Sequence, residues 1–177
     1  MGPIFDQQVF VMKRVFAALL LMTVTSLPAH AAEQKLQGTY SDWTVYSRAE
    51  GTDMICFALA KPEVSAPTSV NHGDVYFMVA SWKSGAATEQ PSLLAGYPLK
   101  STRSPSAYVG RTKVTMYPSE NEAFVDSGAD ERNLVAKMRA GANMRIEAVS
   151  SRGTETSYVF SLSGITAALR KVKSTCS

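Results

Sequence analysis

The feature that most constrains the fold is a pair of cysteines, Cys56 and Cys176, in a chain that also carries an export signal. The basic start at residues 12–14 is followed by an apolar run from Val15 to Val24 and by the small-x-small site at residues 29–31. This order is typical of a secretory signal peptide. An exported chain with two cysteines most simply closes one disulfide, so we predict a Cys56–Cys176 bond rather than a free thiol at Cys176.

The signal peptide is predicted to span residues 1–31 and to leave residues 32–177 as a single domain. Residues 1–11 place a neutral-to-acidic stretch ahead of the basic pair, so Met12 is a possible true start. The apolar run is about half the roughly 20 residues that a transmembrane helix needs. We therefore expect no transmembrane segment in the mature chain. A short buried core helix is the alternative interpretation of the run.

Charge and composition exclude several classes of function. The net charge is only +3 and the basic residues are scattered, so we expect no nucleic-acid partner. After residue 31 the chain holds one histidine, His72, which cannot supply a zinc site with two cysteines already in a disulfide. No glycine-rich nucleotide motif is present, and no cofactor is predicted.

The first half of the domain has the pattern of short strands separated by turns. We predict a hairpin from residues 43–46 and 54–60, and a strand at residues 75–82 that is apolar on both faces and therefore buried. The Pro- and Ser-rich stretch at residues 62–73 is predicted to be a long loop. Further short strands are expected at residues 92–97, 111–117 and 122–125.

The second half combines two helices with a clear hairpin. Acidic residues open and basic residues close residues 130–141, which favours a helix whose Gly141 takes the left-handed position after its end. Alternation at residues 144–148 and 156–162 around a turn at residues 150–153 predicts a hairpin. A last helix is expected after Ser163, its predicted N-cap.

The apolar stripe of that last helix consists of residues spaced three and four apart: Ile165, Ala168, Leu169 and Val172. A disulfide from Cys176 would fix this helix against the second strand. Many short strands and two modest helices predict a mainly β, antiparallel sandwich or barrel.

The residues that could carry chemistry are few. There is no Gly-x-Ser-x-Gly nucleophile elbow, and a lone loop histidine such as His72 is usually just solvated. The carboxylates Asp126, Asp130 and Glu131 are close in sequence, but turn and helix-cap roles are expected for them. We therefore predict no catalytic residues, no bound metal and no enzyme activity.

Exposed turns are better candidates for contact with a partner. Arg152, Gly153 and Thr154 form the tip of the predicted hairpin, where a guanidinium could meet a carboxylate or phosphate through two parallel hydrogen bonds. Tyr97 could present an aromatic ring at a strand end, although a place in the core is the preferred interpretation.

The chain also resembles the invasion-associated locus B family of bacterial exported proteins. The matching segments run in order over about residues 40 to 176 and end at the final cysteine. They are residues 42–46, 55–62, 91–98, 129–131, 138–141, 151–156, Tyr158, 161–164 and Cys176.

This resemblance implies an immunoglobulin-like β-sandwich in the periplasm or outer envelope, linked in some host-associated bacteria to host-cell entry. It brings no catalytic residues. Many family members have a further cysteine soon after the tryptophan strand, and residues 46–48 have none here.

Three functions remain open from the sequence. The first is a non-enzymatic envelope protein that binds a protein or another envelope component. The second is a periplasmic hydrolase of unrecognised type. The third is an inhibitor or chaperone that adds a strand to a client.

Overall fold

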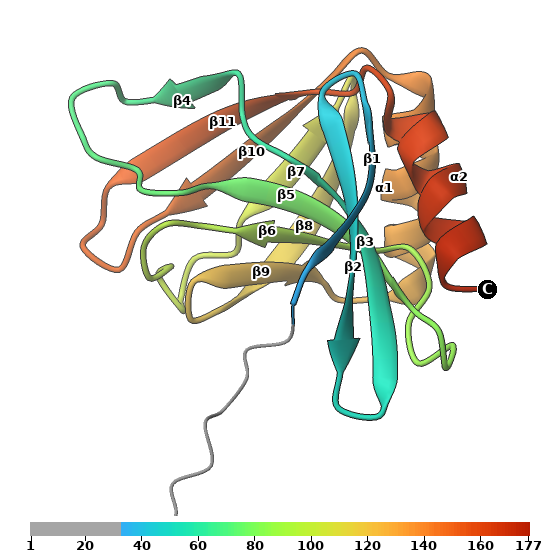
Figure 1. Cartoon of the computed structure of the whole chain (residues 1–177). Helices are drawn as coiled ribbons and strands as arrows, with labels where there is room; N and C mark the ends of the chain where they lie inside the picture. Colours follow the sequence, from blue (N-terminus) through green and yellow to red (C-terminus); the bar gives the residue numbers. More distant parts are fainter. Residues whose placement is uncertain (1–32) are drawn as a thin grey trace, which may run out of the picture. The chain divides into compact units, whose positions relative to one another are not determined.

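The computed structural model describes residues 33–177, which form eleven strands and two helices (Figure 1). The predicted signal peptide and its cleavage site lie outside these residues. In chain order the elements are β1 (Lys35–Tyr40), β2 (Trp43–Glu50), β3 (Asp53–Ala60), β4 (Val64–Ala66), β5 (Tyr76–Trp82), β6 (Gln90–Leu94), β7 (Ser106–Val109), β8 (Thr112–Ser119), β9 (Glu122–Val125), α1 (Gly128–Ala140), β10 (Asn143–Val149), β11 (Glu155–Ser161) and α2 (Ile165–Thr175).

All strands belong to one open antiparallel sheet in the order β1-β2-β3-β5-β6-β9-β8-β7-β10-β11-β4. The prediction of a mainly β, antiparallel domain with two helices, one of them C-terminal, is confirmed. This strand pairing does not show the predicted immunoglobulin-like sandwich of two separate sheets. The reason is β8, whose residues 112–115 pair with β7 and whose residues 116–119 pair with β9, so that hydrogen bonding continues from one half of the sheet to the other.

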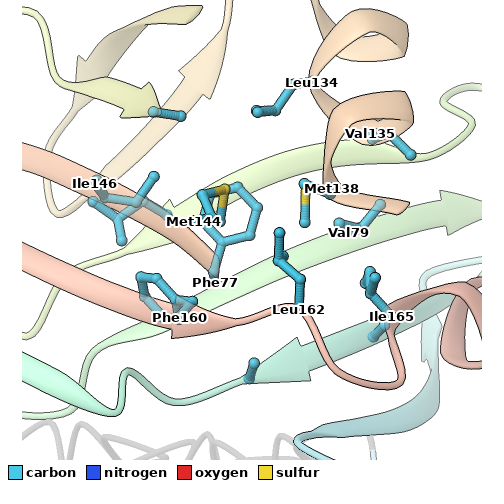
Figure 2. Packing of buried hydrophobic residues seen from close by; sticks show 14 of the residues in the cluster. Phe77, Val79, Leu134, Val135, Met138, Met144, Ile146, Phe160, Leu162 and Ile165 are labelled. Carbon is cyan, nitrogen blue, oxygen red and sulfur yellow. The ribbon is translucent and has the colours of Figure 1, made fainter. Parts of the chain in front are cut away.

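The sheet encloses its core because its two halves face each other. Phe77 of β5 and Phe160 of β11 are not on neighbouring strands, yet their ring centroids are 5.8 Å apart. Helix α1 contributes Leu134 and Met138, which point into the same cluster as Met144 of β10 (Figure 2). Helix α1 packs against β6 to β9 and α2 against β1, β2, β3 and β5.

Strand β5 confirms the prediction of a strand that is apolar on both faces. Phe77 and Val79 point into the core, whereas Ala80 belongs to a second apolar cluster on the other face of the sheet. That second cluster is centred on Ile55 and Phe57 of the neighbouring strand β3. Alternation along the strand therefore places apolar side chains on both sides of the sheet.

Helix α1 begins two residues earlier than predicted, at Gly128, and is capped by Ser127. The Ser127 hydroxyl accepts a hydrogen bond from the Asp130 amide at 3.2 Å and donates to its carboxylate at 2.8 Å. The left-handed conformation predicted for Gly141 is wrong: its φ is −92°. Glycine is needed there for packing, because a Cβ would lie 2.6 Å from Cγ1 of Val109.

Helix α2 has the predicted buried stripe, but Ser163 is not its N-cap. The N-cap is Gly164, in the left-handed region with φ +89°. A Cβ on Gly164 would lie 2.0 Å from the carbonyl oxygen of Tyr40, so both the conformation and the space require glycine. The end of β1 and the start of α2 are therefore in close contact.

A buried hydrogen bond joins strands β2 and β11. The indole N–H of Trp43 at the start of β2 donates to the carbonyl oxygen of Ser161 at 3.0 Å, and Trp43 is fully buried. The Ser161 hydroxyl donates to the Asp42 carboxylate at 2.7 Å. These contacts hold β2 against the end of β11.

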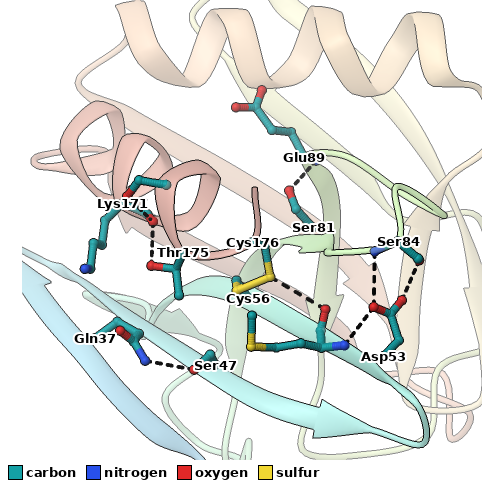
Figure 3. The surroundings of a disulfide bond; sticks show 12 residues. Gln37, Ser47, Asp53, Cys56, Ser81, Ser84, Glu89, Lys171, Thr175 and Cys176 are labelled. Carbon is teal, nitrogen blue, oxygen red and sulfur yellow. Dashed lines mark hydrogen bonds between the residues drawn. A yellow bond between two sulfur atoms is a disulfide. The ribbon is translucent and has the colours of Figure 1, made fainter.

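The predicted disulfide is present and joins Cys176 at the end of α2 to Cys56 of β3 (Figure 3). The two Cα atoms are 5.9 Å apart, within the range that a disulfide requires. Both cysteines are buried. The bond therefore fixes the last helix to the second strand of the predicted hairpin.

Candidate functional site

A cavity of about 430 Å³ lies at the turn end of the β10–β11 hairpin. We call it the hairpin-end pocket. Three separate segments line it: residues 70–72, residues 96–98, and residues 150–152 together with Thr154 and Thr156. The pocket thus joins the predicted contact residues Arg152 and Thr154 to His72 and Tyr97, which no sequence pattern connects to them.

Backbone hydrogen bonds hold the second and third segments together. The Ser151 amide donates to the Pro98 carbonyl oxygen at 2.8 Å, and the Lys100 amide donates to the Val149 carbonyl oxygen at 2.9 Å. The first segment lies so close to the second that a Cβ on Gly96 would be 2.3 Å from the His72 carbonyl oxygen. The walls of the pocket are therefore fixed by the backbone.

The predicted contact tripeptide forms the hairpin turn. Gly153 has φ +91°, and its amide donates to the Ser150 carbonyl oxygen at 2.8 Å. The Thr154 amide donates to the Ser150 hydroxyl at 3.1 Å. Gly153 therefore shapes the turn, while Arg152 and Thr154 line the pocket.

His72 is held by both of its ring nitrogens. Its Nε2 lies 2.9 Å from the carbonyl oxygen of Pro67, and its Nδ1 lies 2.8 Å from the hydroxyl of Tyr158. The imidazole also meets the Tyr158 ring edge-on, with 5.3 Å between centroids. His72 is thus part of an ordered network and not the solvated side chain that the sequence suggested.

The network continues through three hydroxyl groups into the sheet. The Tyr158 hydroxyl donates to the Tyr97 hydroxyl at 2.8 Å, which lies 2.6 Å from the Thr156 hydroxyl. Thr156 donates to the carbonyl oxygen of Ala148 at 3.2 Å. Burial, reinforced by the hydrogen bond to Tyr97, raises the pKa of Tyr158 far above its usual range, so this tyrosine keeps its proton.

The pocket has basic side chains in its lining and no acidic ones. Arg152 and His72 line it, and the lining residues include no aspartate or glutamate. The nearby Asp74 faces Lys61, with 3.5 Å between carboxylate oxygen and Nζ. A second cavity, of about 480 Å³, lies on β7, β10 and β11. Its lining includes Glu147 and Glu155 as well as basic residues, so it contains side chains of both charge types, unlike the hairpin-end pocket.

The three sequence-predicted carboxylates do not line the hairpin-end pocket. Asp126 is exposed after β9, and Asp130 takes part in the cap of α1. Partial burial raises the pKa of Glu131, against the opposing effects of Gln90 and Arg132. Turn and cap positions were the roles expected for these residues.

Tyr158 and Thr156 belong to this network, although the sequence pattern predicted only that they lie on one face of a strand. The available signal was two hydroxyl-bearing side chains at inward positions of a strand, because a buried hydroxyl needs a hydrogen-bond partner. Tyr97 packs partly against the core, as predicted, but its hydroxyl group accepts a hydrogen bond from Tyr158 and so belongs to the network.

Within residues 33–177 no helix is both long enough and apolar enough to span a bilayer. The same part of the chain holds no group of three or more histidine, cysteine or acidic side chains placed to bind a metal ion.

Fold and disulfide together define a class: a mainly β, disulfide-linked domain of the kind found outside the cytoplasm. Residues 43–173 match the family described as Invasion associated locus B (IalB) protein, and the chain belongs to that family. No curated protein matches the sequence. Family membership and the disulfide both suggest an extracytoplasmic location.

Proposed function

We propose that this protein is a non-enzymatic envelope protein that binds an anionic group of a partner in the hairpin-end pocket. The observation that carries the proposal is the pocket's composition: Arg152 and His72 line it, and no acidic side chain does. The partner is a protein or another envelope component that presents a carboxylate or a phosphate-type group.

Arg152 is the main contact in this proposal. It is exposed on a turn whose backbone is fixed by hydrogen bonds, and none of the ion pairs among residues 33–177 involves it. A guanidinium presents paired N–H donors that match the oxygens of a carboxylate or phosphate. Its position in the lining of a cavity allows the anion to be partly enclosed.

The two alternative functions have less support. A hydrolase would need an available base, but both ring nitrogens of His72 already have partners. A strand-adding protein would need a long regular edge. The edge strands here are β4, with three residues, and β1, whose pairing is irregular between Leu36 and Gly38.

The proposal places the mature protein in the periplasm or at the outer envelope, after removal of residues 1–31. A contribution to host-cell entry belongs to the proposal because the family's description refers to invasion. Neither point depends on the hairpin-end pocket, so each can fail separately.

The test is site-specific crosslinking in intact cells, with a photoreactive residue in place of Ser151, which is exposed and lines the pocket. We expect capture of a partner that is lost in Arg152→Gln and competed by added sulfate. The matched control is Arg111→Gln, which changes an exposed arginine in the β7–β8 turn and should leave capture unchanged.

Capture that is the same in Arg152→Gln as in the wild type would contradict the binding proposal. The non-enzymatic part is tested by screening the purified protein against ester, phosphate, peptide and glycan substrates. A turnover that falls at least about tenfold in His72→Ala or Asp126→Ala would overturn it.

A further inference from the structure

The network behind the hairpin-end pocket has an unusual property: both of its ends are carbonyl oxygens. Five hydrogen bonds run from the Pro67 carbonyl through His72, Tyr158, Tyr97 and Thr156 to a carbonyl of β10. A carbonyl oxygen can only accept. Each of the five bonds therefore needs a hydrogen from one of the four side chains between the ends.

The directions of the bonds follow from the far end. Thr156 donates to the carbonyl of β10, so Tyr97 must donate to Thr156, and Tyr158 must donate to Tyr97. Each hydroxyl has then used its one hydrogen. The bond between Tyr158 and His72 must be donated by Nδ1 of the imidazole, while the bond to Pro67 must be donated by Nε2.

A neutral imidazole carries one N–H hydrogen and an imidazolium carries two. With a neutral His72 the four side chains supply four hydrogens for five bonds. All five bonds form together only when His72 is positively charged. The raised pKa of Tyr158 supports this count, because that residue remains a phenol with one hydrogen.

We propose that His72 is the second cation of the hairpin-end pocket, that the pocket takes a doubly charged phosphate- or sulfate-type oxyanion, and that this binding strengthens as the pH falls. This inference rests on the proposed function. Arg152 donates hydrogen bonds to the anion, whereas His72 supplies charge alone because its nitrogens are occupied. A doubly charged anion complements two cations better than a single carboxylate does.

The charged and titratable groups around His72 come from three elements. Arg152 lies on the hairpin turn, Tyr158 on β11, and Tyr97 on the segment after β6. Asp74, two residues further along the chain, pairs with Lys61. The positive charge of Arg152 disfavours a positive charge on His72. A bound anion offsets this repulsion, so a bound anion and a charged His72 stabilise each other.

The experiment measures the binding of inorganic sulfate by NMR to the exported protein purified from its cells. Sulfate keeps its double charge from about pH 8 to about pH 5.5, the range across which histidines titrate, so a change in affinity reports on the protein. We expect affinity to rise about fivefold or more as the pH falls across this range, the size of effect that one nearby charge exerts at a partly exposed site. In the sulfate-bound state at the lower pH, nitrogen-15 spectra should show hydrogens on both ring nitrogens of His72.

Two variants separate the parts of the proposal. In His72→Gln the sulfate affinity should no longer depend on pH. In Thr156→Val two of the five bonds are removed, and a neutral His72 supplies enough hydrogens for the rest. Its gain in affinity at low pH should therefore shrink.

Each outcome has a distinct meaning. Binding that needs Arg152 but is the same at both ends of the pH range overturns the inference and leaves the proposed function intact. A pH dependence that persists in His72→Gln also overturns it. Sulfate binding that is unchanged in Arg152→Gln contradicts the proposed function. A single hydrogen on the His72 ring at the lower pH refutes the hydrogen count whatever the binding result, and acetate binding as tightly as sulfate refutes the preference for a doubly charged anion.

Discussion

Removing the disulfide should cost this domain a large share of its stability. The bond closes a loop of 120 positions between Cys56 and Cys176. Restricting a loop of that length in the unfolded chain is worth about 4–5 kcal/mol in the chain-entropy description. A domain of this size is typically stable by about 5–15 kcal/mol in total, so the loss would be about a quarter of that or more.

The effect should be local as well as global. Helix α2 keeps its buried stripe without the bond, and its larger side chains, Ile165, Leu169 and Val172, each contribute about 1.5–3 kcal/mol. The helix should therefore stay docked at its first turns, while its last turn around Thr175 opens. In the Cys56→Ala/Cys176→Ala protein the lost sulfur atoms leave a small void that adds to the destabilisation.

The measurement is urea unfolding of three samples: the oxidised wild type, the reduced wild type and the double alanine variant. Reduction keeps the sulfur atoms, so it isolates the loop-closure effect from the void. Ser174→Ala is the control in the same turn of α2, because Ser174 is exposed, and it should change stability by less than about 0.5 kcal/mol. A loss below about 1 kcal/mol on reduction, with no change in denaturant slope, would refute the reasoning. Amide exchange should show the earliest opening in the last turn of α2.

Three further predictions concern stability. Trp43→Phe keeps an aromatic ring but removes the buried N–H donor, and urea unfolding should show a loss of about 1–3 kcal/mol; a change near zero would mean that the carbonyl finds another partner. Gly141→Ala should cost about 1–3 kcal/mol through overpacking, whereas Gly128→Ala at the start of the same helix should be neutral, and equal effects would contradict the packing argument. The Ser84 hydroxyl, with help from backbone N–H groups, lowers the pKa of Asp53, so the stability from Asp53 is present above the unfolded-state pKa and lost as the pH falls through the folded one. Melting curves of Asp53→Asn should be less sensitive to acid below about pH 4 than those of the wild type, and parallel curves would refute this.

Local periodicity predicted much of the fold. Alternation along residues 144–148 and 156–162 gave the β10–β11 hairpin, and the stripe beginning at Ile165 gave the buried face of α2. Strand β4 was missed because three residues cannot show a period, and residues 62–73 were interpreted as one loop. The bend of the sheet at β8 depends on which strands pair, and that choice has no local signature in the sequence.

The residues of the hairpin-end pocket were likewise only partly predictable from the sequence. Arg152 was identified because an arginine on a tight turn is exposed wherever the turn lies. Its neighbours come from residues 70–72 and 96–98, and only the folded chain brings these segments together. The role of His72 depends on Tyr158, which is more than eighty positions away, and a single sequence does not indicate that contact.

The strand shared by both halves of the sheet has a consequence for recognition. Two separate sheets can shift against each other when a ligand arrives, but here any such shift must bend β8. One wall of the hairpin-end pocket is the segment that comes after β6 in the chain, and another is the turn between β10 and β11. Strand β6 and the β10–β11 hairpin belong to opposite halves of the sheet. The pocket is therefore preorganised, and an anion bound there as proposed would not lose affinity to the ordering of loops. Rapid association with little structural change is the kinetic behaviour that such a rigid frame supports.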